Sequence, residues 1–213
     1  MELKVYDIRS VSAEKYESWL SQLKVAQQNQ IRGLSTNIGR VRATVVAHFI
    51  RQICGEREIL RTARGKPYAV GGIEFNVSHS DYMVACVWDM CPVGIDIQRI
   101  KPIRRRLASR FCTTDEWNYL TMGQILEDEF ITDPKMLDKA FRIWTGKEAW
   151  YKYTGEGWNE FPGINTLTFP EEVREWYTQY DEYMICVCGE TRQMSFFDRD
   201  ENAVITNMLK NDV

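Results

Sequence analysis

The residues best suited to chemistry are two acidic groups, Asp96 and Glu148, that the sequence places on regular secondary structure. Glu148 falls within a helical stripe of apolar residues, where a carboxylate is costly unless a cation or hydrogen bonds hold it. The stripe consists of Leu137, Ala140, Phe141, Trp144 and Tyr151. Lys152 lies one turn after Glu148 on the same side, so the spacing fits an ordinary intrahelical Glu–Lys pair equally well.

Asp96 belongs to an alternating strand pattern, V-G-I-D-I-Q, at residues 93–98. Gly94, Asp96 and Gln98 share the face opposite the apolar residues. A glycine two residues before an aspartate leaves room for something bulky close to the backbone. Two acidic groups on rigid elements could form an oxygen-rich site for Mg²⁺. The alternative is a strand face that points outward and ends in a turn.

Small polar residues end an earlier predicted strand, N-V-S-H-S at residues 76–80. Ser78 and His79 could present a hydroxyl and an imidazole to an anion. A turn rich in Ser and Asn requires no function, so that interpretation stays open. A Ser–His nucleophile pair is disfavoured because neighbouring strand residues point to opposite faces.

One run of charge is basic and contains no acidic residue between positions 97 and 114. Its members are Arg99, Lys101, Arg104, Arg105, Arg106 and Arg110. The run could be a solvated helix face. It could also bind an acidic partner helix or phosphate groups.

The elements that must position these residues follow from apolar periodicity, caps and turns. Helices are predicted at 12–26, 35–54, 104–111 and 133–154, and strands at 3–8, 59–61, 68–70, 74–78, 82–88, 93–97, 164–169 and 183–188. A capping box is expected at Thr113 and Glu116. The strand Y-M-V-A-C-V at 82–87 also resembles Y-M-I-C-V-C at 183–188. Helices followed by strands therefore occur twice, which predicts two related α+β lobes.

Composition narrows the class of protein. The 213 residues carry 27 basic and 30 acidic side chains, which argues against a basic nucleic-acid binder. No uncharged stretch is long enough to span a membrane, and the first ten residues lack a signal-peptide core, so neither membrane insertion nor secretion is expected. The six Cys include no C-x-x-C pair and only His48 and His79 accompany them, so we expect reduced core cysteines and a cytoplasmic protein.

Taken together, these segments resemble the 4′-phosphopantetheinyl transferase superfamily, in its longer two-lobed, surfactin-synthetase-activating (Sfp-type) branch. F-N-V-S-H-S at 75–80, V-G-I-D-I-Q at 93–98 and W-T-G-K-E-A-W-Y-K at 144–152 resemble three family motifs and occur in the family's order. G-K-P at 65–67 and F-C-T-T-D-E at 111–116 match the family less specifically. The likeness spans about residues 40–188.

The resemblance implies an α+β fold of two similar lobes related by a pseudo-twofold axis. Each lobe would be a small, mainly antiparallel sheet packed with helices. The lobes are expected at residues 1–92 and 93–213, with the active-site cleft between them.

The resemblance also implies a reaction, in which the phosphopantetheine arm of coenzyme A moves onto a serine of an apo acyl or peptidyl carrier protein. The products would be the holo carrier and 3′,5′-ADP. Asp96, Gln98 and Glu148 would hold Mg²⁺, for which Mn²⁺ could substitute. Glu148 would accept the serine proton, and Lys152 would stabilise the leaving phosphate. Coenzyme A would contact Arg42, Lys66, Ser78 and His79, and the carrier would dock on Arg104, Arg105, Arg106 and Arg110.

Gln98 departs from the family pattern, which usually has Glu at this position. An amide oxygen can face a metal ion but contributes no charge, which predicts weaker metal affinity. Two alternatives therefore stay open. One is a degenerate family member that binds coenzyme A or a carrier without transfer, and the other is a Mg²⁺-dependent nucleotide phosphohydrolase.

Overall fold

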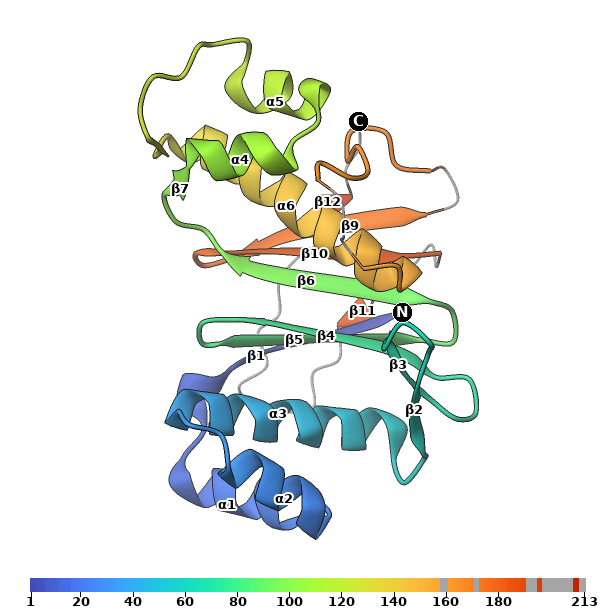
Figure 1. Ribbon diagram of the computed structural model, residues 1–213. Helices are drawn as coiled ribbons and strands as arrows, with labels where there is room; N and C mark the ends of the chain where they lie inside the picture. Colours follow the sequence, from blue (N-terminus) through green and yellow to red (C-terminus); the bar gives the residue numbers. More distant parts are fainter. Residues whose placement is uncertain (158–160, 171–172, 191–194, 197–208, 211–213) are drawn as a thin grey trace.

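The protein is built around two four-stranded β-sheets packed between helices, with two smaller two-stranded sheets, as a computed structural model shows (Figure 1). The structure describes residues 1–157, 161–170, 173–190, 195–196 and 209–210. Parts of the predicted second lobe, 93–213, thus lie outside the described residues. The α+β class predicted from the sequence is confirmed. Within the described ranges, no helix combines the length and apolar character needed to cross a bilayer.

The elements follow one another in two similar series. The first contains β1 (Glu2–Asp7), the short 3-10 turn η1 (Ile8–Ser10), α1 (Ala13–Ser21), α2 (Val25–Arg32), α3 (Asn37–Cys54), β2 (Ile59–Arg61), β3 (Pro67–Ala69), β4 (Glu74–Ser80) and β5 (Met83–Asp89). The second contains β6 (Val93–Arg99), β7 (Ile103–Arg104), α4 (Arg105–Phe111), α5 (Thr114–Thr121), β8 (Phe130–Ile131), α6 (Pro134–Thr154), β9 (Arg174–Tyr180), β10 (Tyr183–Gly189), β11 (Ser195–Phe196) and β12 (Leu209–Lys210).

Both series share one connectivity: a strand, a long helix and then a hairpin whose second strand pairs with the first strand. The main strands are ordered β1-β5-β4 in one sheet and β6-β10-β9 in the other. The hairpin turns match as well, because Asp81 and Asp181 both adopt a positive φ, of 46° and 50°. The residues after these turns are Tyr82 and Glu182, so Met83 corresponds to Tyr183. The repeat is therefore real, but the sequence echo that aligned Met83 with Met184 is wrong by one residue.

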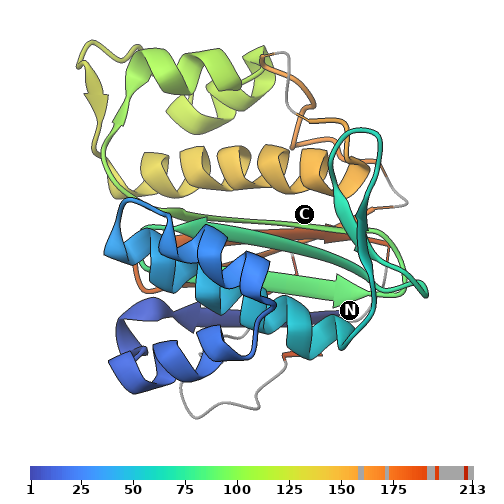
Figure 2. The ribbon, with the colours of Figure 1, turned by 60° about the horizontal axis from the view of Figure 1, so that its bottom comes forward.

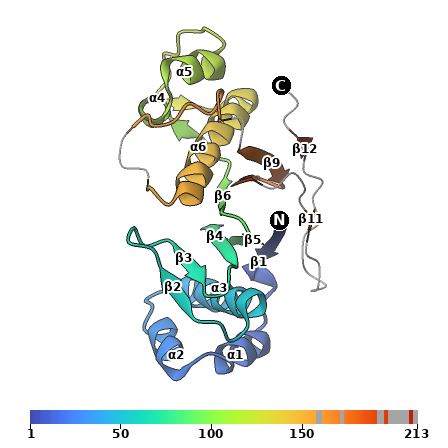
Figure 3. The same ribbon diagram turned by 90° about the vertical axis from the view of Figure 1, so that its right-hand side faces the viewer.

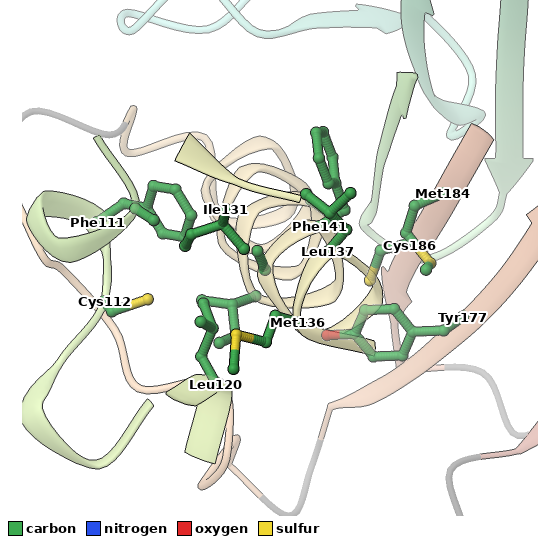
Figure 4. Close-up of a cluster of buried hydrophobic side chains, with 14 of the residues drawn as sticks. Phe111, Cys112, Leu120, Ile131, Met136, Leu137, Phe141, Tyr177, Met184 and Cys186 are labelled. Atoms are coloured by element: carbon green, nitrogen blue, oxygen red, sulfur yellow. The ribbon is translucent and has the colours of Figure 1, made fainter. Parts of the chain in front are cut away.

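The register sets which side chains face which layer. In β5, Met83, Ala85 and Val87 enter the core between the sheets, whereas Val84 and Cys86 face α3. In β10, Tyr183, Ile185 and Val187 enter the same inter-sheet core. Met184 and Cys186 lie on the other face and pack against α6, whose far side meets Phe111, Cys112 and Leu120 (Figure 4). Each of these two strands thus packs a separate apolar cluster on either face.

The two sheets are joined along neighbouring edges by side chains of β4. Asn76 Oδ1 accepts a hydrogen bond from Ile95 N at 3.2 Å, and Ser78 Oγ accepts one from Ile97 N at 3.4 Å. Ser80 Oγ accepts one from Arg99 N at 3.0 Å. The donors are alternate backbone N–H groups on the edge of β6, which otherwise need a partner strand. The side chains of one strand thus replace the backbone of a missing one.

Helix α6 lies unusually close to β6 at Gly94. A Cβ atom built on Gly94 would stand 2.1 Å from Ala149 O and 2.4 Å from Tyr153 N. The glycine therefore makes room for the helix backbone, as the sequence pattern suggested. The face of β6 that carries Gly94, Asp96 and Gln98 is consequently covered by α6 and does not point outward.

Two of the elements predicted from the sequence are wrong. The helix predicted at 12–26 is two helices, because the chain turns at Gln22 so that Leu20 and Ile31 both pack in one cluster against α3. The strand predicted at 164–169 is irregular. There, Ile164 N donates to Tyr151 Oη at 3.2 Å, and Thr166 N donates to Glu116 Oε1 at 2.7 Å. Side chains satisfy this backbone, so it needs no partner strand.

We predict that Gly94→Ala destabilises the protein by at least about 2 kcal/mol, because the new methyl group overlaps backbone atoms that cannot rotate away. The free energy of unfolding in urea measures the effect. Gly33→Ala is the matched control, since its Cβ would meet atoms no closer than 3.4 Å at a negative φ of −72°. Equal stability of the two variants would contradict the close approach of α6.

Candidate active site

Asp96 is the centre of the candidate site. Asp96 is 1% exposed and lies in the middle of β6, beneath α6. Oδ1 accepts hydrogen bonds from Ser78 Oγ at 2.7 Å and Lys152 Nζ at 2.6 Å, and Oδ2 accepts one from Gln98 Nε2 at 3.1 Å. A buried carboxylate requires such partners. The structure therefore joins β4, β6 and α6 at one acidic group.

Lys152 reaches Asp96 from the last turn of α6. Its ammonium group also donates to Ser78 Oγ at 3.0 Å. Its side chain is 28% exposed, so one end of the pair contacts solvent. The intrahelical Glu148–Lys152 pair that spacing allowed is thus replaced by a pair between Lys152 and the strand below.

Glu148 lies one turn before Lys152 and is half-buried. Burial raises the pKa of Glu148, and the negative charge of Asp96 raises it further, whereas Lys152 lowers it. This mutual repulsion indicates that the two carboxylates share one neighbourhood. The site thus combines the buried carboxylate of Asp96, the half-buried carboxylate of Glu148 and the ammonium group of Lys152.

His79 points to the other face of β4, towards α3. Its Nδ1 lies 3.4 Å from Arg42 Nη1, and the guanidinium has only donors, so Nδ1 is the acceptor and any ring proton sits on Nε2. Burial lowers the pKa of His79, and the charge of Arg42 lowers it further. Arg42 also donates to Asp81 O at 2.6 Å. Ser78 and His79, predicted together, therefore serve two different faces of the strand.

A pocket of about 630 Å³ opens beside this pair, between α2, α3 and β4. Its lining includes Gln27, Gln30, Val46, Ile50 and Val77 together with Arg42 and His79. In the described part of the chain, Arg42 Nε is a buried nitrogen that lacks a hydrogen-bond partner. The pocket thus offers apolar walls, neutral amides and a guanidinium.

Lys66 connects the lobes at the C-terminal end of α6, the end that also carries Lys152. The hairpin of β2 and β3 rises beside the C-terminal end of the helix (Figure 2), where Lys66 Nζ donates to Tyr153 O at 2.8 Å. It also lies 3.8 Å from Glu74 Oε2. Burial lowers the pKa of Lys66, which Glu74 partly offsets. The structure therefore gives Lys66 a helix-capping contact close to, but distinct from, the contacts of Ser78.

Arg99 lies where the two sheets meet and is not part of a solvated basic helix face. Its guanidinium lies 3.2 Å from Asp81 Oδ2 and 2.9 Å from Glu182 Oε1. These residues belong to the β4–β5 and β9–β10 turns, so one side chain contacts both hairpins. The ends of the two sheets on either side of the site are thereby held together.

The remaining arginines lie around α4, beyond α6 (Figure 1). Arg105 donates to the Leu126 carbonyl, and Arg104 lies 3.8 Å from Glu129. Arg106 and Arg110 are exposed, and the Arg110 guanidinium stacks over Phe161 at 5.5 Å. The four arginines of the predicted docking surface therefore differ in their contacts. Arg104 and Arg105 already contact the segment before β8, whereas Arg106 and Arg110 do not.

Sequence reasoning missed a buried ion pair next to the site. Lys147 Nζ lies 2.7 Å from Glu116 Oε2, and both side chains are 0% exposed. Lys147 also donates to Pro162 O at 2.6 Å, while Glu116 accepts from Thr166 N and Thr113 N, each at 2.7 Å. The pair therefore holds the segment 161–167 over α6. Lys147 directly precedes Glu148 in the sequence, so this contact lies next to the candidate site. The capping box predicted at Thr113 and Glu116 is confirmed, but it was only part of the role of Glu116.

Within the described ranges, no three or more His, Cys, Asp or Glu side chains gather into a cluster that could hold a metal ion. The side-chain oxygens at the site that could bind a metal ion are those of the Asp96 and Glu148 carboxylates and of the Gln98 amide.

Comparison with known proteins places the chain in a family. Residues 92–205 match the model of the 4′-phosphopantetheinyl transferase superfamily. The chain is 31% identical to the 4′-phosphopantetheinyl transferase psf-1 of Bacillus pumilus over 194 residues, which cover 82% of this chain and 78% of that protein. It is 29% identical to the 4′-phosphopantetheinyl transferase gsp of Aneurinibacillus migulanus over 156 residues, 68% of this chain and 60% of that protein. The 4′-phosphopantetheinyl transferase Sfp of Bacillus subtilis strain 168 is 36% identical over 83 residues, 39% of this chain and 34% of that protein.

The chain therefore belongs to the 4′-phosphopantetheinyl transferase superfamily. The enzyme class predicted from its motifs, a transferase that moves phosphopantetheine onto carrier proteins, is confirmed.

We predict that Lys147→Met destabilises the protein by about 3 to 5 kcal/mol, because it leaves the carboxylate of Glu116 buried and uncompensated. The free energy of unfolding in urea measures the effect. Lys135→Met, an exposed position on the same helix, is the control and should change stability by no more than about 0.5 kcal/mol. A Lys147 variant as stable as the control would show that the pair does not hold this segment.

Proposed function

We propose that the protein uses a divalent cation, Mg²⁺ with Mn²⁺ as a substitute, to transfer the phosphopantetheine arm of coenzyme A to a serine of an apo carrier protein. The supporting observation is the meeting of Asp96, Glu148 and Lys152 at the junction of the two lobes. Carboxylates and a lysine are the groups expected where a pyrophosphate is bound and cleaved. We also propose the lobe boundary between residues 92 and 93, in the turn between β5 and β6.

The residues at the junction fit a divalent cation. Burial raises the pKa of Glu148 and the negative charge of Asp96 raises it further, and both carboxylates are hard oxygen ligands of the kind Mg²⁺ prefers. The side-chain amide of Gln98 donates to the carboxylate of Asp96, and after rotation it could present its oxygen to the cation. Mg²⁺ usually takes only one or two protein carboxylates and completes its shell with phosphate oxygens and water. When bound, the cation would neutralise charge on the pyrophosphate.

Coenzyme A would bind across the junction. We propose that its nucleotide portion occupies the pocket between α2, α3 and β4, because Arg42 and His79 line it and Arg42 Nε has no hydrogen-bond partner among the described residues. Apolar walls and amides suit a purine base. Ser78 would then contact a phosphate from the opposite face of β4, and Lys66 would do so from the β2–β3 hairpin.

The chain's own groups would perform the proton transfer and charge stabilisation. Glu148 would accept the proton of the carrier serine, whose oxygen forms the new bond to the phosphorus that carries the pantetheine arm. The bond from that phosphorus to the bridging oxygen breaks, and 3′,5′-ADP leaves with the bond's electron pair. Lys152, already held beside Asp96, would stabilise the negative charge on the departing phosphate.

The carrier would dock on α4. Arg106 and Arg110 are exposed one turn apart, and Leu107 between them is 42% exposed. An apolar side chain flanked by guanidinium groups suits a helix whose acidic residues surround an apolar one. Arg104 and Arg105 would contribute less, since Glu129 and the Leu126 carbonyl already engage them. Phe161, beneath Arg110, extends the same surface.

A reducing compartment such as the cytoplasm remains our prediction for the location. All six cysteines are free thiols, and five of them are buried. Buried thiols act as small apolar side chains and do not require an oxidising compartment.

The deciding experiment incubates the protein with coenzyme A, Mg²⁺ and several apo carriers, and then weighs each carrier. We expect one carrier to gain the mass of a phosphopantetheine arm. Glu148→Gln should lower kcat/KM at least about 100-fold because the proton acceptor is lost. Asp138→Asn, on the same helix but paired with Arg142, is the control and should retain activity.

Two outcomes would overturn the proposal. Release of nucleotide from coenzyme A without any carrier would identify a phosphohydrolase. Binding of coenzyme A without any gain of carrier mass would identify a degenerate member, which is the alternative that Gln98 keeps open.

We predict that the double charge reversal Arg106→Glu/Arg110→Glu raises KM for the carrier roughly tenfold, because it turns attraction to an acidic helix into repulsion. The KM for coenzyme A should not change. Arg32→Glu, which reverses an exposed arginine on α2, is the control. Steady-state kinetics with each substrate varied in turn make the comparison, and an unaltered carrier KM would locate docking elsewhere.

A further inference from the structure

We propose that Lys152 is an internal competitor for the divalent cation: it occupies Asp96 when no cation is bound and must leave this carboxylate for the cation to bind. The inference rests on the proposed cation site, but it concerns a contact between two residues of this chain. It adds an exchange step that the proposed reaction does not itself require.

The first argument is that three donors already bind the carboxylate of Asp96. Oδ1 accepts from Ser78 and Lys152, and Oδ2 accepts from Gln98. The residue is 1% exposed, so water cannot readily take the place of these donors. A cation that binds Oδ1 therefore has to displace Ser78 or Lys152.

The second argument is that Lys152 is the donor able to leave Oδ1. Gln98 binds the other oxygen, Oδ2, and its neutral amide could turn its own oxygen towards the cation. Ser78 is held by its second contact, with the Ile97 N–H, and forms part of the bridge between β4 and β6. Lys152, by contrast, is at the end of a flexible side chain that remains 28% exposed. Its ammonium group can move into water while its aliphatic stem stays against the protein. The short contact at 2.6 Å is thus strong but not enclosed.

The third argument is electrostatic. Asp96 and Glu148 together contribute two negative charges and Lys152 one positive charge, so the site without a metal ion carries −1. A divalent cation and an ammonium group at the same carboxylate would repel one another strongly in a partly buried site. With Gln98 in place of an acidic residue, the described residues provide no third carboxylate there to hold both. One positive group therefore replaces the other.

The exchange has a consequence for catalysis. When the cation arrives, Lys152 is released from Asp96 at the junction where the proposed pyrophosphate binds. The same ammonium group that neutralised the site without metal then becomes free to pair with phosphate oxygens. The cation would thus make Lys152 available to the substrate.

Binding of Mn²⁺ to the full chain without coenzyme A or carrier tests this, using isothermal titration calorimetry and the loss of the free Mn²⁺ electron paramagnetic resonance signal. We expect Lys152→Met to bind Mn²⁺ at least about tenfold more tightly than the wild type, since its competitor is removed. In EDTA the variant should melt at a lower temperature, because Asp96 loses its cation. Added Mn²⁺ should raise its Tm more than that of the wild type.

Two further variants keep the test decisive. Lys152→Gln removes the charge but retains a neutral donor, so it protects folding and should still bind Mn²⁺ more tightly. Lys135→Met removes a positive charge from the first turn of the same helix, 17 residues away, and should leave Mn²⁺ affinity unchanged. Equal or weaker affinity in both Lys152 variants, or an equal gain in the Lys135 variant, overturns the proposal. So does the absence of Mn²⁺ binding in every variant.

The outcome is separable from that of the proposed function. A wild type that modifies a carrier while its Lys152 variants gain no Mn²⁺ affinity refutes only the exchange. A protein whose Lys152 variants gain affinity, but which modifies no carrier, supports the exchange and refutes the transfer.

Discussion

The candidate site depends on how the edges of two sheets are joined. Strand β6 presents the N–H groups of Ile95, Ile97 and Arg99 to β4, and the side chains of Asn76, Ser78 and Ser80 accept them. An edge strand left without partners is costly when buried, so these oxygens are structural before they are functional. Because Ser78 also contacts Asp96 and Lys152, the bridge between the lobes and the candidate site share an atom.

The second constraint is the distance between α6 and β6. Gly94 lets the helix backbone approach the strand, and the buried pair of Lys147 and Glu116 holds the helix from its other side. Figure 3 shows the result from the side, with α6 above β6 and α3 below the opposite sheet. Packing therefore brings α6 close to Asp96, where Lys152 forms its ion pair.

Local patterns predicted most of this framework from the sequence, because alternation and capping act over a few residues. The opposite faces of 93–98 and the Asp133 cap of α6 illustrate that reach. The pairing of Glu116 with Lys147 could not be predicted, since it joins residues 31 apart and each has a sufficient local explanation. The irregular segment 164–169 was predicted as a strand for the same reason: its apolar residues do not reveal that Tyr151 and Glu116 satisfy its backbone. The one-residue error in the repeat shows that letters alone do not fix a register.

Arg99 carries one more consequence of the duplicated architecture. Asp81 and Glu182 come from the turns of corresponding hairpins, and a single guanidinium contacts both. The two turns are thus coupled through one side chain. A change of charge at either turn alters the partners left to Arg99, so substitutions at positions 81, 99 and 182 should be designed as a set.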